Sequence, residues 1–311
     1  MSTEVTKPHA GMPAFLTSFI DAAPSVDIAE FEMAGGGFSV LRLQTDRDGS
    51  VKVKFKKETI HTFTAKQFPR NFHLVHMSKP RAMFVEPEQQ PRCRSDDGVT
   101  GKGANGQDGS VHKCATCPQD VFGTGKEGRG KACKQTIAAV MMPNEIRHAG
   151  AALYIPVALA FWLEASEVKY EIVAGKEGQQ FCKVDMAGVT DDNGELKLVP
   201  WLFKVTSSSF KPWTGMLNDI KAMGEVFARK PVLARLRVET VVEQIQGFSV
   251  GVWKFLVSPP VENSDEIAIQ IAIQSAKQIA ENQPTIAESA TEADGLVSNG
   301  AKPASSDDIP Y

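Results

Sequence analysis

The sequence predicts a mainly β (α+β) fold, and three observations support that prediction. Short segments rich in Val, Ile, Phe and Trp recur along residues 38–257 and are separated by turn residues. One of them, Val51 to Lys57, alternates strictly between apolar and lysine side chains, as a strand with one buried face does. The 311-residue chain is 42% hydrophobic, which is enough for one large or two small cores.

The elements follow in order after a loosely ordered lead-in over residues 1–35. A strand at 38–45 and the strand at 51–57 flank a turn at 46–49, which predicts an antiparallel hairpin with one cationic face. Further strands are predicted at 72–76, 82–85, 136–142, 180–185, 196–205, 232–242 and 248–257. Helices are predicted at 156–168, 214–228 and 264–280, and the last of them begins at Ser264 with acidic residues in its first turn.

Together these elements predict an OB-like antiparallel barrel over residues 36–261, with a metal-binding loop inserted at about 89–134. The loop is rich in Gly, Lys, Asp and Cys and almost lacks large apolar side chains, so it cannot bury a core of its own. A helix at 262–281 follows the body. Residues 282–306 contain Pro, Ser, Thr, Ala, Gly and Glu but no aromatic residue, which predicts a disordered linker before an acidic tip.

Four of the five cysteines lie within that loop, at Cys93, Cys114, Cys117 and Cys133, in the pattern C-x20-C-x2-C-x15-C. The central Cys-x2-Cys spacing lets two thiolates bind one tetrahedral ion, and the outer pair would complete a structural Zn²⁺ site. Metal binding would also explain how a segment without a core becomes ordered. A redox Cys-x-x-Cys, four unrelated thiols and a site with His112 as one ligand remain open, whereas Cys182 is expected to be a core thiol.

The charge is unevenly distributed along the chain. Residues 262–311 contain nine acidic and two basic side chains, a net charge of −7 against −3 for the whole chain, which leaves +4 for residues 1–261. A basic body with an acidic tail is typical of a polyanion-binding domain with a separate interaction arm. No stretch has the length of an apolar membrane span and the first residues lack the apolar core of a signal peptide, so we expect a cytoplasmic protein without a membrane partner.

Sequence-tolerant binding of single strands requires cations for the phosphates and exposed aromatic rings for the bases. The cations expected at such a surface are Lys52, Lys54, Lys56, Arg70, Arg92, Arg94, Lys126, Arg129, Lys131, Lys204, Arg235 and Arg237. The aromatic candidates are Phe72 and Trp213, with Phe63 and Phe68 nearby in the sequence. The segment GTGKEGRGKACK does not have the Walker spacing, so an ATPase site is not expected.

The chain ends in Asp307-Asp308-Ile309-Pro310-Tyr311. These five residues resemble the acidic tip of bacterial-type single-stranded DNA-binding proteins, which end in Asp-Asp-Ile-Pro-Phe after a disordered linker, with Tyr311 standing where Phe is usual. The resemblance implies that the tip recruits replication, recombination and repair proteins. Chemically, Tyr311 offers an aromatic ring beside the terminal carboxylate, and Asp307 and Asp308 would steer the tip to basic partners.

The body looks more like a phage or mobile-element counterpart of that family, because the cysteine segment is similar to those of zinc-containing single-strand binders of tailed phages and of replication protein A. We therefore expect sequence-tolerant binding and protection of single-stranded DNA, with partner recruitment by the tip. No catalytic constellation is visible in the sequence, so we do not expect an enzyme. The alternatives are a single-strand annealing recombinase, a zinc-stabilised protein–protein adaptor and a nuclease with unrecognised acidic residues.

Overall fold

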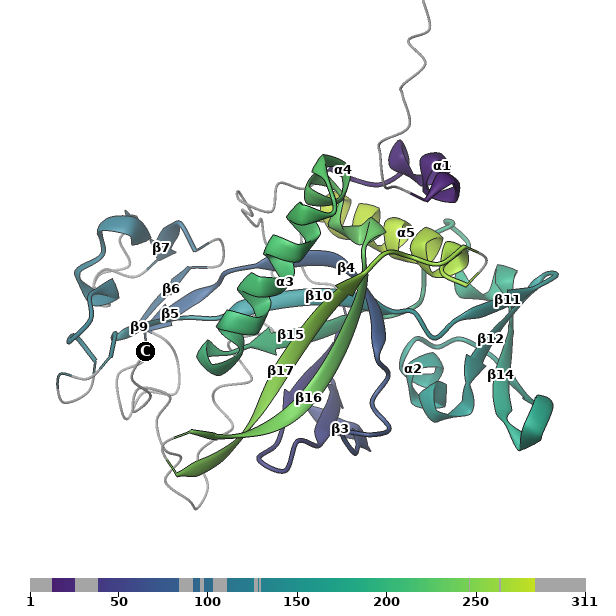
Figure 1. The fold of residues 1–311 in the computed structure, drawn as a ribbon, viewed down its shortest axis with the longest axis horizontal. Coiled ribbons are helices and arrows are strands. Elements are labelled where there is room, and N and C mark those ends of the chain that lie inside the picture. Colours follow the sequence, from purple (N-terminus) through teal and green to yellow (C-terminus); the bar gives the residue numbers. More distant parts are fainter. Residues whose placement is uncertain are drawn as a thin grey trace, which may run out of the picture.

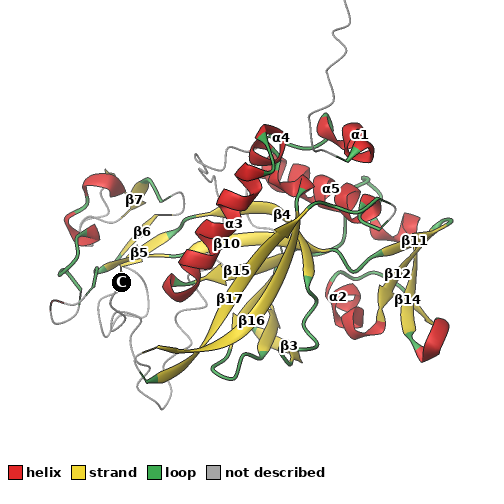
Figure 2. Ribbon diagram, in the orientation of Figure 1, coloured by secondary structure: helices red, strands yellow, loops and turns green. Residues whose placement is uncertain are grey.

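The structure is a computed structural model that describes residues 13–25, 39–83, 92–95, 98–102, 111–125, 128, 130–245, 247–262 and 264–282. It confirms the mainly β class, with one large sheet, two smaller sheets and a few helices (Figures 1 and 2).

The large sheet has eight strands in the order β17-β16-β4-β10-β15-β1-β2-β3. Their bounds are β1 (Leu41–Thr45), β2 (Val51–Phe55), β3 (Glu58–Phe63), β4 (Asn71–Ser78), β10 (Ile137–Pro143), β15 (Trp201–Val205), β16 (Arg235–Ile245) and β17 (Phe248–Ser258). The pair β1–β15 is parallel, and the other neighbouring pairs of this sheet are antiparallel. The predicted alternation in β2 is confirmed, since Val51 and Val53 are fully buried while Lys52 and Lys54 are partly exposed.

An aromatic core fills one side of this sheet. Phe68 lies with its ring centroid 5.7 Å from that of Phe72, 5.6 Å from Trp253 and 6.3 Å from Trp201. Phe203 continues the cluster at 5.1 Å from both Phe72 and Trp253. These rings come from β4, β15, β17 and the loop after β3, so the core ties together strands that are far apart in the sheet.

Two side-chain hydrogen bonds connect the β16–β17 ribbon to the β1–β2 turn, and these elements share no backbone ladder in the described sheet. The hydroxyl of Thr45, at the end of β1, donates to the carbonyl of Gly251 in β17, and Thr240 in β16 donates to the carbonyl of Gly49. A Cβ on Gly251 would lie 2.4 Å from the carbonyl oxygen of Asp46. The β1–β2 turn therefore touches the β16–β17 ribbon directly, but the described strands do not close into the OB-like barrel that the sequence predicts.

The smaller sheets lie on opposite sides of the large one (Figure 1). A four-stranded sheet consists of β11 (Arg147–Ala149), β12 (Ala152–Pro156), β14 (Gln180–Asp185) and β13 (Glu171–Ala174). Cys182 lies there with no exposed surface, as expected of a core thiol. The other, five-stranded sheet consists of β8 (Val111–Lys113), β7 (Thr100–Lys102), β6 (Cys93–Ser95), β5 (Arg81–Met83) and β9 (Cys133–Gln135). We call the described part of residues 81–135 the cysteine subdomain.

The helices are α1 (Thr17–Ile20), α2 (Ala160–Ala165), α3 (Phe210–Ala222), α4 (Glu225–Arg229) and α5 (Glu266–Asn282). Short 3-10 turns occupy Ala14–Leu16, Cys114–Thr116, Pro118–Asp120, Val157–Leu159, Lys176–Gly178, Met186–Val189, Ser207–Ser209 and Pro231–Leu233. The helix predicted at 214–228 is divided at Gly224, which has a φ of 126°. Within the predicted lead-in, Leu16 is completely buried in the main core, so this part of the N-terminal region belongs to the body.

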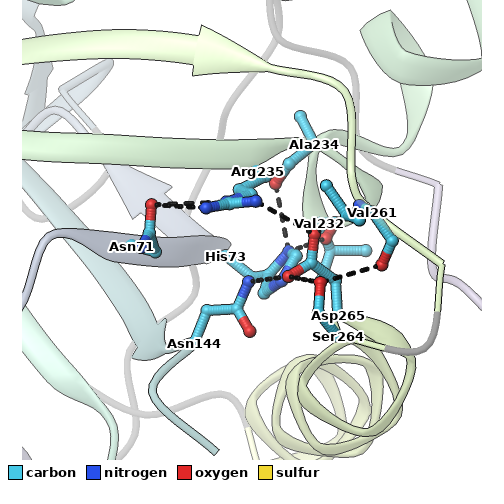
Figure 3. Close-up of polar contacts among 9 residues, drawn as sticks. All are labelled: Asn71, His73, Asn144, Val232, Ala234, Arg235, Val261, Ser264 and Asp265. Atoms are coloured by element: carbon cyan, nitrogen blue, oxygen red, sulfur yellow. Dashed lines mark hydrogen bonds and ion pairs between the residues drawn. The ribbon is translucent and has the colours of Figure 1, made fainter.

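Helix α5 lies across β4 and β10 and is attached by a buried polar network (Figure 3). The carboxylate of Asp265 accepts from the side-chain amide of Asn144 at 2.7 Å and from the backbone N–H of Val261 at 2.5 Å. Arg235 lies 3.7 Å from the same carboxylate. Nδ1 of His73 lies 3.0 and 3.1 Å from two backbone carbonyls of the segment before β16. Helix α5 is therefore part of the body, not an appendage to it.

Candidate nucleic-acid interface and cysteine centre

The side of the large sheet that faces away from the aromatic core carries cations. Strands β1, β2 and β15 are neighbours, and together they contain four Lys or Arg residues and no Asp or Glu. Arg42 is paired with Lys54 and with Leu202, so these side chains share one face. Lys52 lies two residues before Lys54, and Lys204 lies two residues after Leu202. Both side chains therefore lie on the same face.

We call this group the cationic face (Arg42, Lys52, Lys54 and Lys204); each of the four side chains is partly exposed, although Leu202 on the same face is buried. Lys52 is 41% exposed and lies 2.8 Å from Asp46. An exposed ion pair of this kind contributes little to stability, because its charges stay hydrated and screened. The ammonium group of Lys52 therefore remains available to a stronger anion such as a phosphate.

Other predicted cations are distributed over different parts of the surface. Arg70 is exposed, and its carbonyl accepts from Val238 next to Arg237, whose side chain forms an ion pair with Glu239. Lys56 is exposed at the turn after β2. Arg92, Arg94 and Lys131 lie in the cysteine subdomain, where Arg94 is paired with Lys102 across β6 and β7. Lys126, Arg129 and the tip Asp307, Asp308, Ile309, Pro310 and Tyr311 lie outside the described residues.

Two predictions for this surface are wrong. Phe72 has no exposed surface and Trp213 has 1%, so neither ring can stack on a base. Phe72 packs in the aromatic core, and Trp213 packs edge-on against Phe255 at 5.1 Å. Arg235 does not point freely into solvent, because its guanidinium bonds to Asn71 and lies beside Asp265 within the network that holds α5.

The four predicted ligand cysteines come together in the cysteine subdomain. Cys93 and Cys133 are paired with Met83 from its two sides, so both side chains lie on the same face of the small sheet. Cys114 and Cys117 lie on a turn in which the N–H of Cys117 donates to the carbonyl of Cys114 at 3.1 Å. All four are free thiols with at most 8% of their surface exposed.

The surroundings of two of these thiols oppose their ionisation. Burial raises the pKa of Cys93, and the charges of Cys117 and Cys114 raise it further. Burial and then Cys117 raise the pKa of Cys133 to about 12, although the nearby Arg81 acts in the opposite direction. Buried thiols of this kind are neutral at pH 7 unless a cation stabilises the thiolates.

The type of ligand in this cluster fits Zn²⁺, since four thiolates form the commonest kind of closed structural zinc site. The positions of the ligands do not yet form such a site. Among the described residues, no group of three or more His, Cys, Asp and Glu side chains is placed so that it could hold a metal ion.

An ion pair fixes the cysteine turn to the small sheet. Asp120, three residues after Cys117, accepts from Arg81 at 2.5 Å and from Lys131 at 3.1 Å. The side chains of Arg81 and Asp120 are 18% and 21% exposed, so this contact is shielded from water more than the surface pairs of the body are. It connects η4 (Pro118–Asp120) to β5 and holds the two central cysteines near the outer two.

The sequence analysis did not include two exposed phenylalanines among its aromatic candidates. Phe122 is 69% exposed and Phe248 is 51% exposed, and they are the most exposed aromatic side chains among the large apolar residues of the described part. Both follow or precede turn signals, at Gly123 and Gly247, and each lies at a loop or ribbon tip where no core exists to cover it. The available signal in the sequence was therefore an aromatic residue next to a glycine, a residue that favours turns.

No family model matches the chain, and comparison with curated proteins and with solved structures found no match. None of the helices in the described part of the chain has both the length and the apolar character required to cross a bilayer.

Proposed function

We propose that this protein binds single-stranded DNA without strong sequence preference and that its C-terminal tip recruits partner proteins. The observation that carries the proposal is the cationic face. Three adjacent strands present Arg42, Lys52, Lys54 and Lys204 on one side while their other side packs in the aromatic core. A row of cations on a rigid sheet suits the regularly spaced charges of a nucleic-acid backbone.

We propose that the large sheet serves as a binding platform in the way that an OB-like barrel does. In an OB fold, a curved antiparallel surface provides the binding platform for a single strand. Here the curved eight-stranded sheet, braced by the contact between the β1–β2 turn and the β16–β17 ribbon, would provide that platform.

Zinc is the second part of the proposal. We propose that Cys93, Cys114, Cys117 and Cys133 hold a structural Zn²⁺ ion, supported by their burial, their reduced state and their mutual proximity. When bound, the ion would stabilise the four thiolates and cross-link β6, the cysteine turn and β9. Arg94 lies in β6, Arg92 precedes it and Lys131 lies shortly before β9, so the metal would hold these cations in place.

The tip is the third part. Residues Asp307 to Tyr311 carry an acidic pair, an apolar pair and a terminal carboxylate, a combination that a basic pocket with an apolar floor would bind. The tip joins the body through α5, which the network around Asp265 anchors to the sheet. The partners expected from the resemblance are replication, recombination and repair proteins.

A fluorescence anisotropy titration tests the DNA-binding proposal. The purified protein is titrated into labelled single-stranded and duplex oligonucleotides over a series of salt concentrations. We expect tighter binding to the single strand and a steep loss of affinity with salt. The double substitution Lys52→Gln/Lys54→Gln removes two phosphate contacts, so the slope of log K against log salt should become shallower by about 1.4.

The matched control is Lys169→Gln/Lys176→Gln, which removes two exposed lysines near the four-stranded sheet and should leave affinity and slope unchanged. A chain that ends at Ser306 should bind DNA at least as tightly as the full chain, because it has lost two competing carboxylates. Absence of binding to either oligonucleotide at low salt would refute the proposal and favour the zinc-stabilised adaptor.

A further inference from the structure

Phe122 lies on a loop that is held rigidly although it has no core. The hydroxyl of Thr124 donates to the carbonyl of Val121 at 2.7 Å and accepts from the N–H of Ala132 at 3.1 Å. The N–H of Gly123 donates to the carbonyl of Gly130 at 2.7 Å. These bonds fix the backbone on both sides of a phenyl ring that is 69% exposed to water.

Phe248 is also exposed, at the tip of the β16–β17 ribbon. Strand β16 pairs with β4 only through Arg235 to Arg237, so the rest of the ribbon projects beyond that strand as two paired strands (Figure 1). At its tip Phe248 is paired with Ile245 and is 51% exposed. Three residues along β17, Gly251 touches the β1–β2 turn, which braces the ribbon against the sheet.

Neither ring packs in the described hydrophobic core, so packing does not explain why a phenylalanine stands at these two positions. Large apolar side chains are usually buried, and exposing a phenyl ring on a well-ordered loop sacrifices the free energy that its burial would provide. The described aromatic core is built from other residues, including Phe72 and Trp213, which the sequence suggested as base platforms. Rigid presentation also lowers the entropic cost of stacking on a ligand.

The two elements that carry these rings project toward the same side of the view in Figure 1. The cysteine subdomain lies at the left of this view, and the tip of the β16–β17 ribbon lies at its lower left. The end of the cationic face at Lys204 points to that side as well, because Lys204 lies next to the first residues of β10, which directly follow β9.

From these observations we infer that Phe122 and Phe248 are the base-stacking residues of the proposed DNA surface, with one on the cysteine subdomain and one on the ribbon. The inference rests on the proposed function and assigns its ligand chemistry: unpaired nucleobases, whose flat faces stack on a phenyl ring regardless of sequence. The cationic face would contact the phosphates, and the two rings would contact the bases at its end.

The test compares oligonucleotides that carry bases with abasic oligonucleotides of the same length and charge. Phe122→Ala and Phe248→Ala should each weaken binding of the base-carrying strand by roughly five- to 100-fold. The same variants should bind the abasic strand like the unmodified protein and keep its salt dependence, because no phosphate contact is lost. Phe122→Tyr and Phe248→Tyr should restore affinity, because they keep the ring.

Matched controls remove an exposed aliphatic side chain from the same element as each ring. Val121→Ala and Leu256→Ala take away side chains that are 56% and 53% exposed and should leave the affinity unchanged. If the unmodified protein binds single strands and the two alanine variants bind equally well, the stacking assignment is wrong and the proposed function stands. If the unmodified protein binds no single strand, both fail. A loss of binding that accompanies a change in oligomeric state would assign the rings to a protein interface and overturn the inference.

Discussion

The eight-stranded body and the cysteine subdomain differ in what holds them together. The body buries a continuous cluster of aromatic and aliphatic side chains from the N-terminal segment to α5. Among the described residues of the cysteine subdomain, few are buried: Ala82, Met83, Ser95 and Gly101 with the four cysteines. The comparison teaches that hydrophobic burial is sufficient for the body, whereas the subdomain depends on backbone hydrogen bonds, the Arg81–Asp120 pair and the chemistry of its thiols.

The largest expected effect is therefore the loss of metal from the cysteine subdomain. In Cys114→Ser/Cys117→Ser, two thiolates are replaced by poor zinc ligands, and the cost to the subdomain should be on the order of 10 kcal/mol. The body should remain folded, because its core does not contain these residues. Metal analysis of the purified proteins, limited proteolysis between residues 81 and 135 and thermal melting would measure the two regions separately.

Cys182→Ala is the control for that experiment. Cys182 is buried in the four-stranded sheet, away from the cluster, so this variant should keep its zinc while the melting temperature of the body falls. If the unmodified protein is isolated from zinc-containing medium without zinc, or if the double serine variant resists proteases equally, the metal proposal is contradicted.

The sequence predicted the alternating strand β2, the start of the last helix and the four-cysteine cluster, because each depends on local spacing. The aromatic residues were harder to place. Phe72 and Trp213 lie in strongly apolar surroundings, and local periodicity shows that an element has two faces but not which of them a distant strand will cover. Burial of Phe72 depends on Trp201 and Phe203 of β15, which follow it by more than a hundred residues. The outward position of Phe122 likewise depends on hydrogen bonds to residues that follow it in the chain.

A pH titration should produce the next largest effect, and it should act on the body. His73 is fully buried, and burial lowers its pKa to about 4 from an ordinary value of 6.5, although Asp265 and two backbone carbonyls oppose the shift. The unfolded chain therefore binds a proton between pH 6.5 and 4 that the folded chain does not. Stability from this residue is complete above pH 6.5 and is lost as the pH falls through that window, by on the order of 3 kcal/mol.

His73→Asn is the matched variant, because the Asn side-chain amide can donate to the carbonyls that face Nδ1 but does not titrate. Its unfolding free energy, measured with urea at several pH values, should decrease less between pH 6.5 and 4 than that of the unmodified protein. His148→Asn, at an exposed position of β11, should follow the unmodified curve. Identical slopes for all three proteins would show that His73 is not the group responsible.

The smallest effect expected concerns the contact that braces the two halves of the large sheet. Gly251→Ala would place a Cβ 2.4 Å from the carbonyl oxygen of Asp46, so the ribbon or the β1–β2 turn must move, at a cost of about 2 kcal/mol. Gly215→Ala is the control, since its Cβ would meet nothing within 4 Å and alanine favours the interior of α3 by about 1 kcal/mol. Urea unfolding should therefore move the two variants in opposite directions, while zinc content stays the same in both because neither glycine lies in the cysteine subdomain. Equal stabilities would mean that the ribbon and the turn are not in contact, and the bracing of the cationic face by the ribbon would have to be abandoned.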